Sequence, residues 1–252
     1  MSIDKSCCVV IPARFKSSRF PGKPLVPLLG KPMVLWVAEL SARAVGSKNV
    51  YVATEDECIA NVVTSAGFNC VMTTDDHPTG TDRVAQAAEQ INADIFINVQ
   101  GDEPVVAPSD ILKVRDAKLA RMDTIINGFC WIGDEEDPSS VNLPKVITNE
   151  RDEMVYMSRV ALPGFKDAKC APSRYKKQVC IYAFTREELA SFRAFGRKSE
   201  LERAEDIEIL RFLELGRVIR MVETQPGSLA VDVPEDVPLL EAALRAAGAG
   251  AR

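Results

Sequence analysis

The chain is poor in histidine and has no long apolar run. Its single histidine, His77, lies in the polar stretch DDHPTGTD, and we interpret it as a solvated loop residue. One histidine leaves little room for a zinc site or a Ser-His-Asp triad. No apolar run approaches the roughly 20 residues of a membrane span, and MSIDKSCCVV at the start lacks a signal-peptide pattern. These absences predict a cytoplasmic protein without a membrane partner.

Other familiar signatures are also missing. No GxGxxG follows the first apolar segment, which argues against a dehydrogenase, and no GxxxxGK[ST] occurs. The seven cysteines are odd in number and form no CxxC pair, so we expect free thiols in a reducing compartment. The formal net charge of -5 argues against a general nucleic-acid binder. Any site for an anion must therefore be local.

Strand-like and helix-like segments alternate through the first half of the chain. Buried strands are predicted at 7–13, 49–54, 68–74 and 94–102, and helices at 32–45, 56–67, 81–93 and 108–122. This order predicts an α/β fold, with a Rossmann-like, mostly parallel sheet and helices on both faces.

The pattern changes after Met122. Strand-like segments at 124–132, 144–148, 154–158 and 179–184 are not separated by long helices. Helices are predicted at 185–195, 200–216 and 234–248, and a strand at 218–224. No linker is visible, so we expect one domain over residues 1–252, with a mixed-strand subdomain inserted at about 123–185.

Cations gather on the loop that follows the first predicted strand. Arg14, Lys16, Arg19 and Lys23 lie within ten residues, with Pro21-Gly22 among them. In open α/β sheets, ligands bind beyond the carboxyl ends of the strands, where Arg and Lys can neutralise phosphate oxygens. We interpret Lys16 as a solvated side chain. The other three cations predict a phosphate site.

Two acidic motifs also follow predicted strands. NVQGDEP places Gln100 and Asp102 at one strand end, and VDVPED places Asp232 at another. Aspartate oxygens are the hard ligands that Mg²⁺ takes alongside substrate phosphates. A pair of aspartates beside a cationic loop predicts phosphoryl-transfer chemistry with Mg²⁺ as cofactor.

Several motifs together resemble one family. IPARFKSSRFPGKPL, TGTDR, NVQGDEP, MSRVALP, IYAF, EDIEILR and VDVPED occur in the order seen in CMP-Kdo synthetases, the 3-deoxy-manno-octulosonate cytidylyltransferases. The resemblance covers roughly residues 7 to 245. It implies a fold like that of the nucleotide-diphospho-sugar transferases and an enzyme that joins CMP from CTP to an acidic acceptor, with release of pyrophosphate. It also implies a homodimer formed through the inserted subdomain.

The resemblance assigns roles by position. Lys23, Arg14 and Asp102 would act in catalysis, and Asp102 and Asp232 would bind the metal. The residues implied to bind CTP are Arg14, Arg19, Lys23, Thr79, Thr81, Arg83 and Gln100. The residues implied to lie at the acceptor are Arg159, Gln178, Tyr182, Glu208 and Ile209.

Two of the acceptor positions depart from the family. Gln178 stands where the family has histidine, and Ile209 stands where it has glutamine. A site built to hydrogen-bond hydroxyls discriminates strongly, and isoleucine cannot replace an amide. Kdo, a modified sugar acid such as amino-Kdo, and a phosphonate such as phosphonoformate are therefore all open as acceptors. A non-enzymatic nucleotide-binding protein is the alternative of another class, although it would not need both Asp102 and Asp232.

Overall fold

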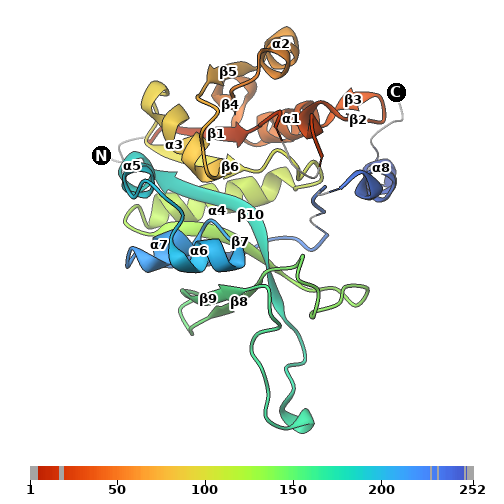
Figure 1. Ribbon diagram of the computed structural model, residues 1–252, viewed down its shortest axis with the longest axis vertical. Helices are drawn as coiled ribbons and strands as arrows, with labels where there is room; N and C mark the ends of the chain where they lie inside the picture. Colours follow the sequence, from red (N-terminus) through yellow and green to blue (C-terminus); the bar gives the residue numbers. More distant parts are fainter. Residues whose placement is uncertain (1–4, 17–19, 228, 232, 247, 249–252) are drawn as a thin grey trace.

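A computed structural model describes residues 5–16, 20–227, 229–231, 233–246 and 248. Its centre is a sheet in the order β11-β7-β10-β6-β1-β4-β5 (Figure 1). The strands β1 (Cys7–Pro12), β4 (Val50–Thr54), β5 (Asn69–Met72) and β6 (Ile95–Val99) run parallel to their neighbours in this set. This half of the sheet confirms the predicted parallel arrangement.

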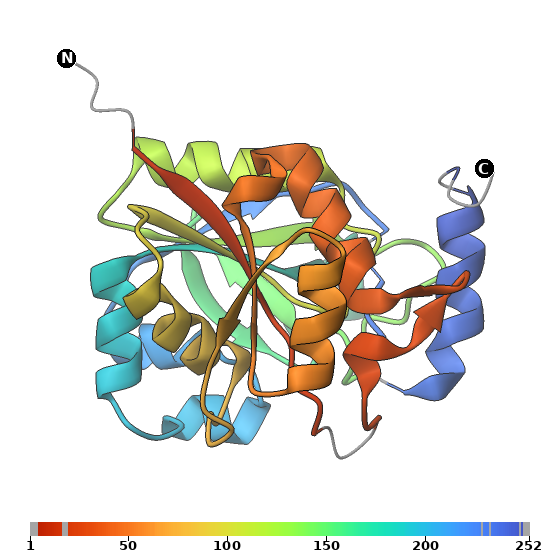
Figure 2. The same cartoon turned by 90° about the horizontal axis from the view of Figure 1, so that it is seen from above.

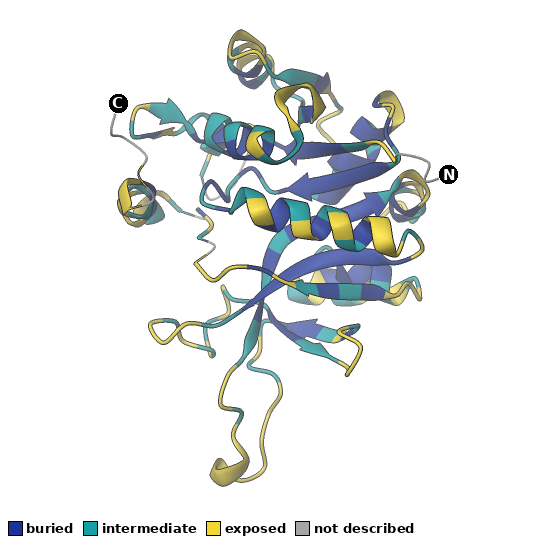
Figure 3. Cartoon of the chain, turned by 180° about the vertical axis from the view of Figure 1, so that it is seen from behind, coloured by how far each residue is buried: buried dark blue, intermediate teal, exposed yellow. Residues whose placement is uncertain are grey.

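The other half of the sheet is mixed. The long strand β10 (Lys176–Thr185) pairs antiparallel with both β6 and β7 (Ile125–Trp131), and β11 (Ile219–Glu223) pairs parallel with β7. Two strands of the segment predicted as an inserted subdomain, β7 and β10, therefore belong to the main sheet. The parts that project from it are the hairpin of β8 (Lys145–Thr148) and β9 (Met154–Ser158) and the loop 159–175 (Figures 1 and 3).

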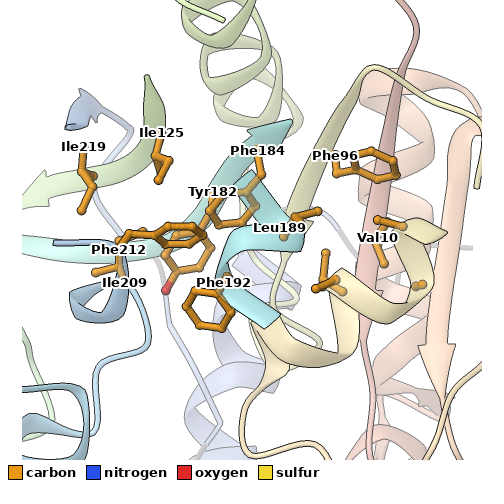
Figure 4. Close-up of a cluster of buried hydrophobic side chains, with 14 of the residues drawn as sticks. Val10, Phe96, Ile125, Tyr182, Phe184, Leu189, Phe192, Ile209, Phe212 and Ile219 are labelled. Atoms are coloured by element: carbon orange, nitrogen blue, oxygen red, sulfur yellow. The ribbon is translucent and has the colours of Figure 1, made fainter. Parts of the chain in front are cut away.

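Helices cover both faces of the sheet, as predicted. One face packs against α1 (Met33–Val45), α2 (Glu57–Ser65) and α4 (Pro108–Ala120). The opposite face packs against α3 (Gly80–Gln90), α5 (Arg186–Ala194) and α7 (Leu210–Glu214), and Figure 4 shows the aromatic part of this core. Side chains alternate between the faces: Val9 joins the first core and Val10 the second.

A third, smaller core lies at one side of the sheet. There α8 (Val237–Ala246) packs near β2 (Pro27–Leu28), β3 (Lys31–Pro32) and the start of α1 (Figure 2). The tryptophan Trp36 belongs to this core and donates from its indole nitrogen to the carbonyl of Leu28 at 2.9 Å. In the part of the chain that is described, no helix is long and apolar enough to cross a membrane.

The single helix predicted over 200–216 is wrong. The structure has α6 (Glu200–Glu205), a turn, and then α7, and Asp206 takes a left-handed conformation with φ 51°. The guanidinium of Arg159 donates to the carbonyls of Glu205 and Asp206, which satisfies groups that a continuous helix would have used internally. A tertiary contact thus ends α6, whereas the local sequence favours continuation.

Candidate active site

The candidate residues lie where parallel strands end at one edge of the sheet. Arg14 follows β1, Glu55 follows β4, and Gln100 and Asp102 follow β6. Gly101 lets two of these loops meet, because a Cβ on it would lie 2.9 Å from the carbonyl oxygen of Pro12. The arrangement matches the general position of ligand sites in open α/β sheets.

Lys23 and Asp102 are in direct contact. The short 3-10 helix η1 (Lys23–Leu25) begins after Gly22, which has φ 70°. From there the Lys23 ammonium donates to a carboxylate oxygen of Asp102 at 2.5 Å and to the Val231 carbonyl at 2.9 Å. The Val231 amide in turn donates to the Asp102 carbonyl at 3.1 Å. Loops from the two ends of the chain thus converge on one ammonium group.

The donor set at this contact fits a magnesium ion. A carboxylate and a backbone carbonyl, both hard oxygen donors, already hold a cation here, namely the lysine ammonium. Asp232 lies outside the described residues, but its neighbour Val231 is one of the two acceptors. Among the described residues, no three acidic, histidine or cysteine side chains form a metal cluster. A magnesium ion completed by substrate phosphates and water needs few protein ligands.

The segment TGTDR forms the first turn of α3. The Thr79 hydroxyl caps the helix by accepting from the Asp82 amide at 3.2 Å. Gln100 lies against this turn, since a Cβ on Gly80 would be 3.2 Å from its side-chain amide. The predicted CTP-side residues Thr79, Thr81 and Gln100 are therefore brought together.

Arg83 points into the protein. Its guanidinium pairs with Glu55 at 2.8 Å and donates to the hydroxyl of Thr73. Burial lowers the pKa of Arg83, and the nearby positive charge of Arg14 acts in the same direction. Glu55 also accepts from the Phe15 amide at 2.9 Å, so it ties the cationic loop to α3. Arg14 itself is exposed, and Arg19 lies outside the described residues.

Gln178 and Tyr182 form one part of the predicted acceptor set. The Gln178 amide donates to the Tyr182 hydroxyl and to the Asn127 side-chain oxygen, each at 3.1 Å. Burial raises the pKa of Tyr182 well above its ordinary value, so the phenol stays neutral at pH 7. The position where the family has histidine thus carries a neutral side chain held by two neighbours.

Glu208 lies on the turn between α6 and α7, and Arg159 contacts the same turn. Glu208 accepts from the amides of Gly80 and Thr81 at 3.0 and 2.8 Å, and Arg159 holds the carbonyls at the end of α6. Burial raises the pKa of Glu208, whereas the hydrogen bonds from α3 oppose this rise. Ile209 is 1% exposed in the aromatic core (Figure 4). Tyr182 belongs to the same core cluster, so the structure brings Ile209 together with one of the predicted acceptor residues.

The sequence did not indicate a role for Asn127 or Glu103. Strand β10 bulges between Val179 and Tyr182, and the Asn127 amide donates to the Val179 and Ile181 carbonyls, each at 3.0 Å. The Cys180 amide at this bulge donates to Glu103 at 3.2 Å. These contacts fasten the NVQGDEP loop to β10. The available signal for Asn127 was an amide inside an apolar strand segment, TIINGFCWI.

Comparison with known proteins identifies the family. The profile of the cytidylyltransferase family matches residues 8–221. The chain is 39% identical over 251 residues to a 3-deoxy-manno-octulosonate cytidylyltransferase of Syntrophotalea carbinolica, covering 95% of this chain and 99% of that protein. An Escherichia coli protein of the same name is 37% identical over 230 residues, covering 90% and 91%.

A solved structure gives the same result. The fold superposes on a CMP:2-keto-3-deoxy-manno-octonic acid synthetase complexed with CTP, with a TM-score of 0.88 and 34% identity. The match covers 96% of this chain and 99% of that one. The chain is therefore a nucleotidyltransferase that belongs to the 3-deoxy-manno-octulosonate cytidylyltransferase family.

Proposed function

We propose that the protein transfers CMP from CTP to Kdo, with release of pyrophosphate and with Mg²⁺ as cofactor. The observation that most directly supports this proposal is similarity, over 90% or more of the chain, to proteins named for this reaction. The contact of Lys23 with Asp102 and the Val231 carbonyl supports it, because it puts a cation and hard oxygen ligands at one strand end.

The site residues have different proposed roles, according to where they lie. Arg14 and Lys23 neutralise phosphate oxygens, while Thr79, Thr81, Arg83 and Gln100 form or support the nucleoside side. Bound magnesium would supply charge neutralisation at the α-phosphate, held by Asp102 and Asp232. Displacement at phosphorus needs alignment and charge stabilisation more than a strong base. A chain with one histidine, His77, is equipped for this chemistry.

Acidic groups of the acceptor would meet the positive charge of Arg159. Tyr182 and Gln178 offer neutral hydrogen-bonding groups suited to sugar hydroxyls. The named relatives favour Kdo as acceptor. They give no support to a phosphonate, which is the alternative suggested by Gln178 and Ile209.

The decisive assay measures pyrophosphate release with CTP and Mg²⁺ against separate acceptors. Kdo, 8-amino-Kdo, other ulosonic acids and phosphonoformate form the panel, and Asp102→Asn serves as the inactive control. We expect turnover with Kdo and little or none with phosphonoformate. Turnover with phosphonoformate alone would reject Kdo and keep cytidylyl transfer. Absence of pyrophosphate release with every acceptor, despite CTP binding, would favour a nucleotide-binding protein without enzymatic activity.

We also propose a cytoplasmic homodimer joined through the projecting hairpin and loop. Val155, Val160 and Phe165 lie there and are 55%, 66% and 52% exposed. Apolar side chains this exposed on one projection suit burial against a second copy. Light scattering on the Phe165→Asp variant is expected to give monomers where the wild type gives dimers, and a wild-type monomer would reject the proposal.

A further inference from the structure

The bulge in β10 brings Gln178 and Tyr182 into contact. The pairing of β10 with β7 shifts between Val179 and Tyr182, and Asn127 on β7 lies opposite Tyr182. Four residues of a regular strand span about 13 Å, whereas a bulge bends the strand locally. Here the Gln178 side-chain nitrogen lies 3.1 Å from the Tyr182 hydroxyl. The bend thus joins two of the side chains proposed to meet the acceptor.

The backbone at this bulge fixes the orientation of Asn127. The side-chain nitrogen of Asn127 donates to the carbonyls of Val179 and Ile181, each at 3.0 Å. Carbonyl oxygens only accept, so the nitrogen must face them and the side-chain oxygen of Asn127 must point the other way. Asn127 is fully buried, and a buried polar atom needs a partner within the protein. Its oxygen therefore requires a donor from a neighbouring side chain.

The oxygen of Asn127 in turn fixes the orientation of Gln178. The two side chains meet at 3.1 Å, and only the nitrogen end of Gln178 can donate to that oxygen. The second proton of the same nitrogen is donated to the Tyr182 hydroxyl. Turning the Gln178 amide over would break both contacts and set one amide oxygen against another. Both donors of Gln178 are therefore engaged within the protein.

The side-chain oxygen of Gln178 stays accessible. Gln178 is half-buried, and within the described part of the chain this oxygen has no hydrogen-bond partner and is not one of the buried polar atoms that lack one. Tyr182 is only 3% exposed, and its hydroxyl lies beside the Cys180 side chain. The Gln178 oxygen is thus the open end of a row of uncharged groups that begins at the β10 backbone.

We propose that Asn127 is a positioning residue for the acceptor, which it serves by holding Gln178 with only its oxygen open to the ligand. This inference rests on the proposed function and deepens it, because it assigns the hydrogen-bond polarity at Gln178. The acceptor must offer a proton there. A sugar hydroxyl supplies one, whereas a fully ionised phosphonoformate has none. A neutral histidine could donate or accept according to its tautomer, but a glutamine held by Asn127 can only accept.

The test is a double-mutant cycle on the KM for Kdo in the pyrophosphate-release assay. Gln178→Met removes the amide at similar side-chain size, and Asn127→Leu removes the group that orients it. Each variant should raise the KM for Kdo about twofold to twelvefold, the range of one net hydrogen bond, and leave the KM for CTP near that of the wild type. Because Asn127 acts through Gln178, the double variant should be no worse than Gln178→Met alone. Effects that multiply in the double variant, or a wild-type KM for Kdo in either single variant, would overturn the proposal.

Asn69→Leu is the matched control. The Asn69 amide also donates to two backbone carbonyls, those of Lys48 and Val50 at 3.1 and 2.9 Å, but it lies on the edge strand β5. This variant is expected to lose stability without a change in the KM for Kdo. A rise in KM equal to that of Asn127→Leu would overturn the proposal, since lost stability alone would then explain both.

Circular dichroism establishes that each variant is folded. If Asn127→Leu does not fold, Asn127→Thr takes its place with the same expected results, because its hydroxyl can still donate to one carbonyl of the bulge but it has no amide oxygen for Gln178.

Kdo analogues that each lack one hydroxyl test the polarity directly. The wild type should discriminate against one of them more strongly than Gln178→Met does, and equal discrimination by the two proteins would contradict the proposal. A wild type that binds CTP but does not turn over Kdo would reject the proposed function and this inference together. Turnover of Kdo with independent effects of the two substitutions would reject only the role of Asn127.

Discussion

Replacing Arg211 by methionine is expected to destabilise the protein strongly. The arginine is fully buried, its guanidinium lies 3.7 Å from the centre of the Phe192 ring, and it pairs with Asp82 and Glu202. Methionine fills much of the volume but leaves two buried carboxylates without their cation. Breaking one partner out of such a network costs about 3–5 kcal/mol. For a chain of this size, that corresponds to a fall in Tm of about 6–20 °C.

Urea unfolding followed by circular dichroism measures this free energy. The matched control is the triple variant Arg211→Met, Asp82→Asn and Glu202→Gln, in which no charge is left unpaired. We expect the triple variant to recover most of the lost stability, because the penalty comes from the desolvated carboxylates. A loss below about 1 kcal/mol in the single variant, the scale of an exposed ion pair, would refute the reasoning. A triple variant as unstable as the single one would refute it as well.

Three further predictions concern single side chains. Lys23→Met should abolish turnover and tighten Mn²⁺ binding to the nucleotide-free protein, measured by electron paramagnetic resonance, because Asp102 loses its ammonium partner; unchanged Mn²⁺ affinity would contradict this. Asn127→Leu should lower the free energy of unfolding in urea by about 2–4 kcal/mol, because two buried carbonyls lose their donor. A loss under about 1 kcal/mol would show that Asn127 does not stabilise the bulge in β10. Burial opposes ionisation of Glu205, but hydrogen bonds from Arg159 and Ser158 hold its pKa below the ordinary 4.5. The difference in free energy of unfolding between the wild type and Glu205→Gln should therefore be largest above pH 4.5 and shrink as the pH falls below it. A difference that grows in acid would contradict this prediction.

The sequence predicted the parallel half of the fold well, for a physical reason. Strands β1, β4 and β6 are covered on both faces, so they appear as continuous apolar runs between helices of amphipathic period. The strand ends then fix where loops can meet a ligand. Lys23 and Asp102 could be assigned to one edge of the sheet on that basis, but their direct contact could not be predicted.

Contacts between distant segments could not be predicted in the same way. The break after α6 depends on Arg159, which lies 46 residues before Glu205 in the chain, and the local pattern of 200–216 is that of one helix. Ile209 was predicted at the acceptor because the family resemblance implies a polar side chain at this position, whereas here its side chain joins the core. Burial decides such cases, and burial is a property of the assembled fold.

The cations of the first loop also differ in a way that their spacing does not reveal. Lys23 is already compensated by Asp102 and 18% exposed at its side chain, while Arg14 is exposed near the buried Arg83. An incoming triphosphate would therefore reach the exposed side chain of Arg14, whereas it could engage Lys23 fully only as the lysine leaves Asp102. Departure of the ammonium would free the Asp102 carboxylate for a divalent cation, so phosphate binding and metal binding should favour each other at this site. An acidic chain can in this way keep the carboxylates it needs for a metal without repelling the nucleotide that brings the metal in.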